Sequence, residues 1–117
     1  IAARHRVAER YNAALETVAV TPAVLSGTTP VWANYTLQLD NRDHVRTKLQ
    51  EAGIPTLTYY PKPIHQRTAY ETFPRAPEGL PVSEALADRV LSLPMHPYLE
   101  QDDQDRIIET IIAAVSA

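Results

Sequence analysis

A ten-residue segment, VWANYTLQLD (31–40), constrains the fold more than any other part of the chain, because its residues alternate between two sides of an extended backbone. One side carries the apolar or aromatic residues Val31, Ala33, Tyr35, Leu37 and Leu39, and the other carries Trp32, Asn34, Thr36 and Gln38. Successive side chains of a strand point to opposite faces of a sheet. The segment therefore predicts a strand with one buried face and one largely polar face.

A short helix and a second strand are expected directly after this strand. NRDHVRTKLQEAG (41–53) has Asn41 as a capping residue, an apolar stripe and a terminating glycine, Gly53. The stripe consists of Val45, Leu49 and Ala52. IPTLTYY (54–60) has the composition of a strand.

Three further helices and one short extended segment are expected. IAARHRVAERYNAAL (1–15) contains strong helix formers, VSEALADRVLS (82–92) forms a helix capped by Ser83, and LEQDDQDRIIETIIAAVSA (99–117) begins with an acidic turn that suits the helix dipole. The last helix has an apolar face made of Ile107, Ile108, Ile111, Ile112 and Val115. SLPMHP (92–97) is a short strand or extended turn, and the residues between 61 and 81 form a long proline-rich loop with one helical turn near HQRTAY.

These elements predict one α+β domain with a small, largely antiparallel sheet and helices packed on one face. The length of 117 residues fits a single domain. The chain begins at Ile1 without a methionine, inside a helical pattern that lacks a capping residue. We therefore expect it to be the C-terminal piece of a longer polypeptide, with residues 1–15 as the end of an entering helix.

Composition excludes several classes of function. A net charge of -3 without a basic cluster argues against nucleic-acid binding, and no apolar run is long enough to cross a membrane. The absence of cysteine excludes disulfides and thiolate zinc sites, and is consistent with a cytoplasmic protein.

The stretch TYYPKPIHQ (58–66) is the strongest candidate for a binding loop. Two prolines stiffen it, and they place a lysine and a histidine close to the adjacent Tyr59 and Tyr60. Because neighbouring residues of a strand face opposite sides, we expect one tyrosine to point inward and the other outward, with His65 also reaching outward. A purely structural role, in which one tyrosine packs and the prolines stiffen a turn, remains the alternative.

No complete catalytic set is present. His5, His44, His65 and His96 lack the spacing of metal ligands, so no metal site is expected. Lys48 belongs to the polar side of a helix, and Lys62 lies on the loop between two prolines. An exposed loop lysine is the simpler interpretation of Lys62 than a Schiff-base nucleophile, which needs a dry pocket.

Several separated motifs, in the same order, resemble the DegT/DnrJ/EryC1/StrS sugar aminotransferases. The matching segments are AGIPTLTYYPKPIHQRTAY (52–70) and LPVSEALADRVLSLPMHPYL (80–99). VWANYTLQLDNRDHVRTKLQEAGIPT (31–56) and LSLPMHPYL (91–99) are most similar to the branch that acts on UDP-2-acetamido-2-deoxy-3-oxo-glucuronate in O-antigen synthesis. The resemblance covers nearly the whole chain.

The resemblance implies the C-terminal small domain of a fold-type-I enzyme dependent on pyridoxal 5'-phosphate (PLP). In such an enzyme the large domain of the same chain holds PLP and the Schiff-base lysine, so the catalytic lysine is expected outside these residues. The resemblance further implies that the intact enzyme is a homodimer that aminates a keto-sugar nucleotide with an amino donor such as glutamate. Tyr60 and His65, followed by Tyr59, match the small-domain contacts to substrate. Two positions depart from the branch, since Tyr59 replaces a common histidine and Lys62 a common apolar residue.

Two functions of another class remain open. The first is a free-standing small-molecule binding module, and the second is a regulatory relative of the PLP-dependent enzymes that has lost catalysis.

Overall fold

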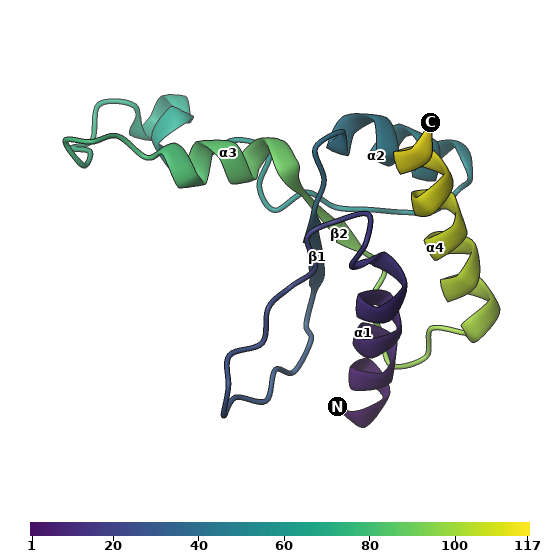
Figure 1. The fold of residues 1–117 in the computed structure, drawn as a ribbon. Coiled ribbons are helices and arrows are strands. Elements are labelled where there is room, and N and C mark those ends of the chain that lie inside the picture. Colours follow the sequence, from purple (N-terminus) through teal and green to yellow (C-terminus); the bar gives the residue numbers. More distant parts are fainter.

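Two short antiparallel strands form the centre of the computed structural model, which describes residues 1–117 (Figure 1). β1 (Tyr35–Gln38) pairs with β2 (Val90–Leu93) so that Tyr35 lies opposite Leu93 and Gln38 opposite Val90. An isolated antiparallel bridge joins Val20 to Gln38, and another joins Leu57 to Ser92. The sheet is thus two strands wide, with one further residue pair at each edge.

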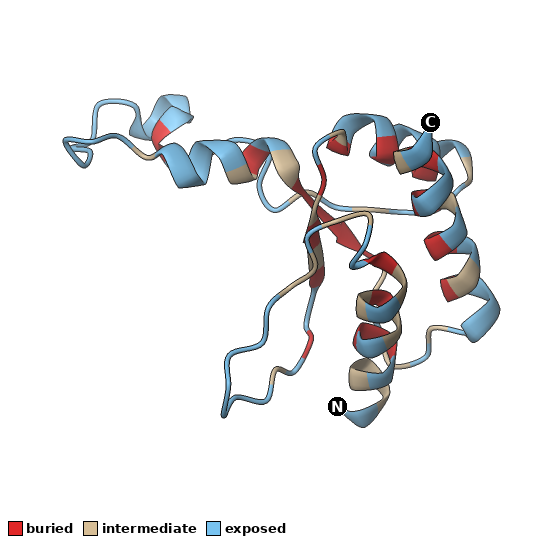
Figure 2. Ribbon diagram, in the orientation of Figure 1, coloured by how far each residue is buried: buried red, intermediate tan, exposed pale blue.

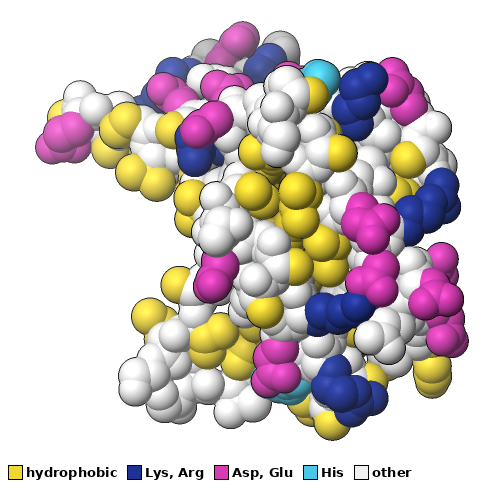
Figure 3. All heavy atoms as spheres, turned by 45° about the vertical axis from the view of Figure 1, so that its right-hand side comes forward, with side chains coloured by type: hydrophobic (Ala, Val, Ile, Leu, Met, Phe, Trp, Pro, Cys, Tyr) yellow, Lys and Arg dark blue, Asp and Glu magenta, His cyan; other side chains and the backbone are white.

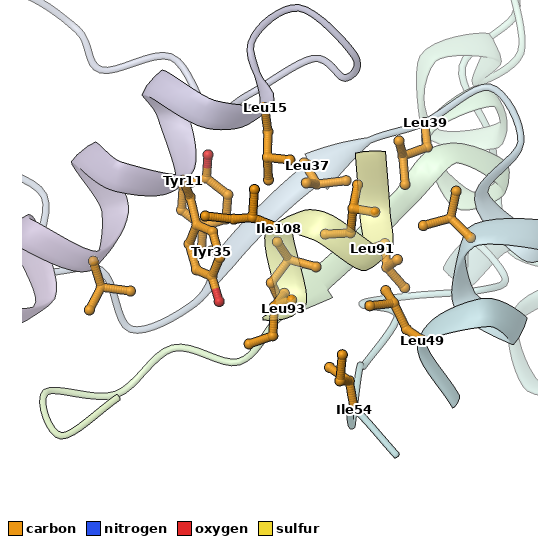
Figure 4. Packing of buried hydrophobic residues seen from close by; sticks show 14 of the residues in the cluster. Tyr11, Leu15, Tyr35, Leu37, Leu39, Leu49, Ile54, Leu91, Leu93 and Ile108 are labelled. Atoms are coloured by element: carbon orange, nitrogen blue, oxygen red, sulfur yellow. The ribbon is translucent and has the colours of Figure 1, made fainter. Parts of the chain in front are cut away.

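Four α-helices accompany the sheet, and the predicted α+β class is confirmed. They are α1 (Ala2–Leu15), α2 (Arg42–Glu51), α3 (Pro81–Arg89) and α4 (Gln101–Ser116). Helices α1, α2 and α4 share one hydrophobic core with the inward face of the sheet, in which Tyr11 and Leu15 of α1 meet Tyr35 and Leu37 of β1 (Figure 4). These three helices pack on one face of the sheet, as the alternation in 31–40 predicts.

The third helix belongs to a different part of the molecule. Residues 59–89, which we call the arm, comprise a long loop followed by α3, and they project away from the remaining residues, which we call the body (Figure 1). The loop contains two single turns of 3₁₀ helix, Ile64–Gln66 and Thr68–Tyr70, close to the predicted turn. His65 and Ala87 are the arm's only buried residues, whereas buried positions run through the body (Figure 2).

The chain is less compact than a typical domain. Its radius of gyration is 15.7 Å, whereas a compact chain of this length has roughly 13 Å. The principal extents are 47 × 37 × 24 Å. No helix is both long and apolar enough to cross a membrane.

The first predicted strand is shorter than expected and partly inverted. Tyr35, Leu37 and Leu39 are buried as predicted, but Val31 is exposed and Trp32 is buried. Trp32 has a positive φ of 53°. This backbone conformation interrupts the extended chain, so the alternation does not continue back to residue 31.

The segments around residues 54–60 and 82–97 also differ from the prediction. In IPTLTYY only Leu57 pairs with the sheet, through hydrogen bonds of 3.1 and 2.7 Å with Ser92, so the full strand was wrong. Helix α3 begins at Pro81 after Leu80, so Ser83 is not its cap. Proline suits the first helical position because it lacks an N–H to satisfy. The strand begins at Val90, two residues earlier than predicted.

Helices α2 and α4 follow their predicted patterns with small differences. Asn41 precedes α2 without a side-chain capping bond, and Gly53 ends the turn after α2 with a φ of 74°. In α4 the buried residues are Gln104, Ile107, Ile108, Ile111 and Ala114. Ile112 is 38% exposed. It lies about 100° around the helix from Ile111, at the margin of the apolar face.

Candidate functional site

A groove runs along the arm between its loop and α3, with a volume of about 900 Å³. The loop contributes aromatic and basic side chains, α3 contributes Ser83, Leu86 and Ala87, and Val90 closes the groove at the sheet. Figure 3 shows hydrophobic side chains exposed on the arm and in the notch between the arm and the rest of the molecule. Although the whole chain carries a net charge of -3, the groove is lined by Lys62, Arg67 and Arg75 and by no acidic residue.

The two adjacent tyrosines lie at the base of the arm and both line the groove. Tyr59 is 42% exposed and Tyr60 is 64% exposed, so the expectation that one of them points inward was wrong. The pairing of the chain with the sheet ends at Leu57, so the alternation of a strand does not apply to them. Their rings meet edge to face with centroids 5.4 Å apart. One side of the groove thus offers two aromatic surfaces and two phenol hydroxyls.

His65 also lines the groove but is buried, contrary to the outward orientation expected for it. Its Nε2 lies 2.9 Å from Oε1 of Glu84, which stands in the first turn of α3. This contact links the loop to the helix across the arm. The structure therefore brings Tyr59, Tyr60 and His65 together around one groove.

Arg75 stabilises the same loop through its backbone. Its guanidinium donates hydrogen bonds to the carbonyl oxygens of His65 (2.8 Å) and Glu71 (3.0 Å). Lys62 and Arg67 have no ion-pair partner in the structure. Two cations are thus free to meet a ligand, while the third shapes the loop.

Neither lysine of the chain has the surroundings that a Schiff-base lysine needs. Lys48 pairs with Glu51 at 2.8 Å on the surface of α2. Lys62 is exposed, and no carboxylate lines the groove to pair with a pyridinium nitrogen. A Schiff-base lysine needs desolvation or a neighbouring base, and the PLP ring nitrogen needs an acidic partner. The residues present here therefore do not fit the cofactor by themselves.

The other candidate sites of the sequence stay separate. Apart from the pair of His65 and Glu84, the histidines have no carboxylate partner, and no group of three or more such side chains is arranged to hold a metal ion.

Sequence reasoning missed several residues of the groove. Arg67 and Arg75 were not singled out, and neither were Tyr70 and Phe73, whose rings meet edge to face at 5.4 Å. Glu84, which contacts His65 but does not line the groove, was not singled out either. The available signal was the concentration of aromatic and basic residues in a long proline-rich loop, because long ordered loops in compact domains are usually functional.

The matched family model covers residues 1–112 and describes the DegT/DnrJ/EryC1/StrS aminotransferase family. A crystal structure of a DegT DnrJ EryC1 StrS aminotransferase from Brucella abortus is 49% identical, with a TM-score of 0.93 over 98% of this chain and 31% of that chain.

Two curated relatives are similar in sequence. The UDP-2-acetamido-2-deoxy-3-oxo-D-glucuronate aminotransferase of Pseudomonas aeruginosa is 40% identical over 101 residues, which is 86% of this chain and 27% of the relative. The dTDP-3-amino-3,4,6-trideoxy-alpha-D-glucose transaminase of Streptomyces venezuelae is 42% identical over 91 residues, or 77% of this chain and 24% of the relative.

This chain thus spans about a quarter to a third of the length of the proteins it matches. The family model nevertheless covers nearly all of its residues, and the fold agrees throughout. The chain belongs to the DegT/DnrJ/EryC1/StrS aminotransferase family.

Proposed function

We propose that this chain is the C-terminal small domain of a PLP-dependent aminotransferase and forms one wall of its sugar-nucleotide site. The intact enzyme transfers an amino group from a donor such as glutamate to a keto-sugar nucleotide. Family membership supports the reaction class. The domain assignment for residues 1–117 is supported by the short share of each relative that the chain matches.

The observation that carries this proposal is the chemistry of the groove. Three cations and several aromatic rings line it without an acidic residue, in a chain whose acidic residues outnumber its basic ones. A nucleotide sugar combines an anionic diphosphate with a base, a pentose ring, a sugar ring and several hydroxyl groups. Basic side chains suit the diphosphate, and aromatic faces suit the rings.

Tyr60 and His65 are the proposed substrate contacts, with Tyr59 beside them. A phenol donates a hydrogen bond to a sugar hydroxyl or a phosphate oxygen while its ring covers apolar edges. An imidazole contacts the same groups in its neutral or its charged form. The neighbouring prolines limit the loop's freedom before binding, which reduces the entropy lost when the ligand is ordered.

The cofactor and the remaining partners belong to the rest of the polypeptide. PLP supplies carbanion stabilisation when bound, and we assign it, with the catalytic lysine, to the large domain of the same chain. The intact enzyme acts as a homodimer in the cytoplasm.

We propose a UDP-linked keto-sugar as the substrate. The Pseudomonas relative acts, by its name, on a UDP-linked 3-oxo-glucuronate, which suggests a role in O-antigen, lipopolysaccharide or related polysaccharide synthesis. Tyr59 and Lys62 differ from that branch and lie in the groove. These two positions are the places to expect a difference in the sugar or in the position aminated.

The alternative is a non-catalytic binding or regulatory module. It is favoured by one observation, that neither lysine is placed to hold PLP. Incubation of the isolated chain with PLP, followed by borohydride reduction and mass analysis, should leave no stable adduct. Stoichiometric labelling of Lys62 would show that the chain holds a cofactor lysine of its own.

The proposal is tested in the intact enzyme with Tyr60→Phe and His65→Ala. Loss of one neutral hydrogen bond to the sugar should cost about 0.5–1.5 kcal/mol, rising toward 3 for a charged phosphate. This corresponds to a several-fold to roughly hundred-fold loss in kcat/KM for the nucleotide sugar. The absorbance of enzyme-bound PLP should not change, because the wall touches substrate and not cofactor.

Tyr98→Phe is the matched control, since Tyr98 is 83% exposed and lies outside the groove. It should keep the kinetics of the unmodified enzyme. Wild-type kcat/KM in both groove variants would mean that the loop is scaffold and that the site assignment is wrong.

A further inference from the structure

We propose that Glu84 is a positioning residue for His65, holding the imidazole so that Nδ1 is the nitrogen offered to a ligand in the groove. This inference rests on the proposed function for the identity of the ligand. The orientation of the ring is a property of the protein alone.

The contact between the two side chains fixes the position of a proton. Nε2 of His65 lies 2.9 Å from Oε1 of Glu84. An ionised carboxylate only accepts hydrogen bonds, so Nε2 is the donor and carries the hydrogen. In the neutral ring Nδ1 is then the acceptor, and it gains a hydrogen only when the ring is charged. The carboxylate of Glu84 thereby selects one tautomer.

The remaining nitrogen is available to the groove. Nδ1 of His65 has no hydrogen-bond partner, although the side chain as a whole is only 9% exposed. Among fully buried side-chain oxygens and nitrogens, only Thr58 Oγ1 lacks a hydrogen-bond partner. Nδ1 also lacks a partner, so it is not fully buried and solvent can reach it. Because His65 also lines the groove, we infer that Nδ1 is reached from the groove.

Helix α3 and the loop of the arm each hold one member of the Glu84–His65 pair. Glu84 is fixed by its place in the first turn of α3, and the backbone carbonyl of His65 accepts a 2.8 Å hydrogen bond from Arg75. The Glu84 side chain is 48% exposed. The carboxylate of Glu84 therefore stays hydrated, and its contact with His65 needs no buried counter-ion. Two anchors leave the imidazole little freedom to turn, which favours pre-organisation of the contact.

The first test reads the tautomer directly and needs no substrate. The intact protein is labelled with ¹⁵N-histidine, and long-range ¹H–¹⁵N spectra are recorded at increasing pH until the His65 ring is neutral. We expect hydrogen on Nε2 in the unmodified protein and a mixture of tautomers in Glu84→Ala. Asp88→Ala is the control, because it removes a carboxylate from the same helix that makes no hydrogen bond or ion pair. It should leave the His65 signals unchanged.

A hydrogen on Nδ1 in the unmodified protein would overturn the inference. So would a tautomer distribution that Glu84→Ala does not change.

The second test separates positioning from structural support through steady-state kinetics with the nucleotide sugar. Glu84→Ala should lower kcat/KM several-fold, and the double variant His65→Ala/Glu84→Ala should lose no more than His65→Ala alone, since Glu84 acts through His65. Glu84→Gln should restore most of the activity, because its amide oxygen still accepts from Nε2. Additive losses would overturn the positioning role.

The two proposals fail in different ways. If His65→Ala keeps full kcat/KM, the proposed substrate contact is wrong, and the tautomer experiment still decides whether Glu84 orients the ring.

Discussion

The body and the arm use the same side chains in opposite ways, and their tyrosines illustrate the contrast. Tyr11 and Tyr35 of the body are fully buried, with ring centroids 4.8 Å apart. Their hydroxyls donate to Pro94 O (2.9 Å) and Asn12 Oδ1 (2.7 Å). Tyr59 and Tyr60, at the base of the arm, are exposed and contact one another at an edge. The first pair fills a core, whereas the second presents its rings and hydroxyls to solvent.

The difference extends to how each region is held. The 17 residues of the hydrophobic core all belong to the body. The arm contributes none of them, and the side-chain hydrogen bonds that hold it together are made by Glu84 and Arg75. Burial of apolar surface is the main source of stability, so the body should determine the stability of the fold. The arm can then carry exposed aromatic and basic groups, which serve binding at little cost to the body.

The largest expected effect comes from truncating the body core. Ile111 is fully buried in α4, and Ile111→Ala should destabilise the chain by about 2–5 kcal/mol, because a cavity remains after the lost methyl groups. Ile108→Ala should fall in the same range. Denaturant titration measures both.

Ile64 provides the matched arm variant, because the same residue type is 68% exposed there. Ile64→Ala should change stability by less than about 0.5 kcal/mol. Similar losses for Ile64 and Ile111 would remove the distinction between the two regions.

A second prediction concerns a buried polar link within the body. Arg42 is 6% exposed, and its Nη1 donates to the carbonyl of Val90 at 2.9 Å, so it ties α2 to the start of β2. Arg42→Met leaves that carbonyl without its donor and should cost about 1–3 kcal/mol. Arg46→Met on the same helix is the control, because Arg46 is 46% exposed and pairs only with Asp43 at 3.4 Å. Equal midpoints for the two variants would contradict a role for the buried bond.

The sequence predicts the body better than the arm because periodicity reports burial. Helix α2 and the apolar face of α4 follow from spacing alone, and the buried Val45, Leu49, Ile107 and Ile111 confirm it. The failures occur where a single backbone or tertiary feature interrupts a pattern. The positive φ of Trp32 reverses the alternation. The run Val90–Leu93 is buried at every position, and such a run does not distinguish a strand from the end of a helix.

The candidate site was predictable in composition but not in geometry. Stiff prolines beside Tyr59, Tyr60 and His65 indicated a binding loop, and the structure places all three around one groove. His65 is buried and contacts Glu84, 19 residues away in another element. No local pattern reports such a contact. Whether the three residues bind a nucleotide sugar remains the prediction tested above.

The third prediction uses pH to probe the buried tyrosines. Burial raises the pKa of Tyr11 and Tyr35, and for Tyr11 the neighbouring Tyr35 adds to the effect. Below the ordinary tyrosine pKa of about 10 both states keep their protons, but above it the unfolded chain ionises first. The free energy of unfolding should therefore fall as the pH rises, by about 1.4 kcal/mol per buried tyrosine at one unit above that value.

Denaturant titration at pH 9 and pH 11 tests this change. Tyr35→Phe should show a smaller decline than the unmodified chain, whereas Tyr98→Phe, at an 83% exposed position, should show the same decline. Identical declines in all three proteins would mean that the buried phenols ionise freely in the folded state.

The smallest expected effect lies in the aromatic pair of the arm. Tyr70 and Phe73 meet edge to face at 5.4 Å, but they are 43% and 59% exposed. Phe73→Leu keeps an apolar side chain and loses only the edge contact, which at such exposure should be worth about 0.5 kcal/mol or less. The matched body change, Tyr35→Leu, removes a buried ring and a 2.7 Å hydrogen bond and should cost several times more.

Denaturant midpoints and kcat/KM for the nucleotide sugar, measured on both variants in the intact enzyme, separate stability from binding. Because Phe73 lines the groove, its replacement should lower kcat/KM while the unfolding midpoint hardly moves. A loss of stability above about 1 kcal/mol, more than an exposed substitution normally causes, would mean that the arm has packing of its own. An unchanged kcat/KM together with an unchanged midpoint would mean that this end of the groove contacts no substrate, and that the wall is confined to the base of the arm around Tyr60 and His65.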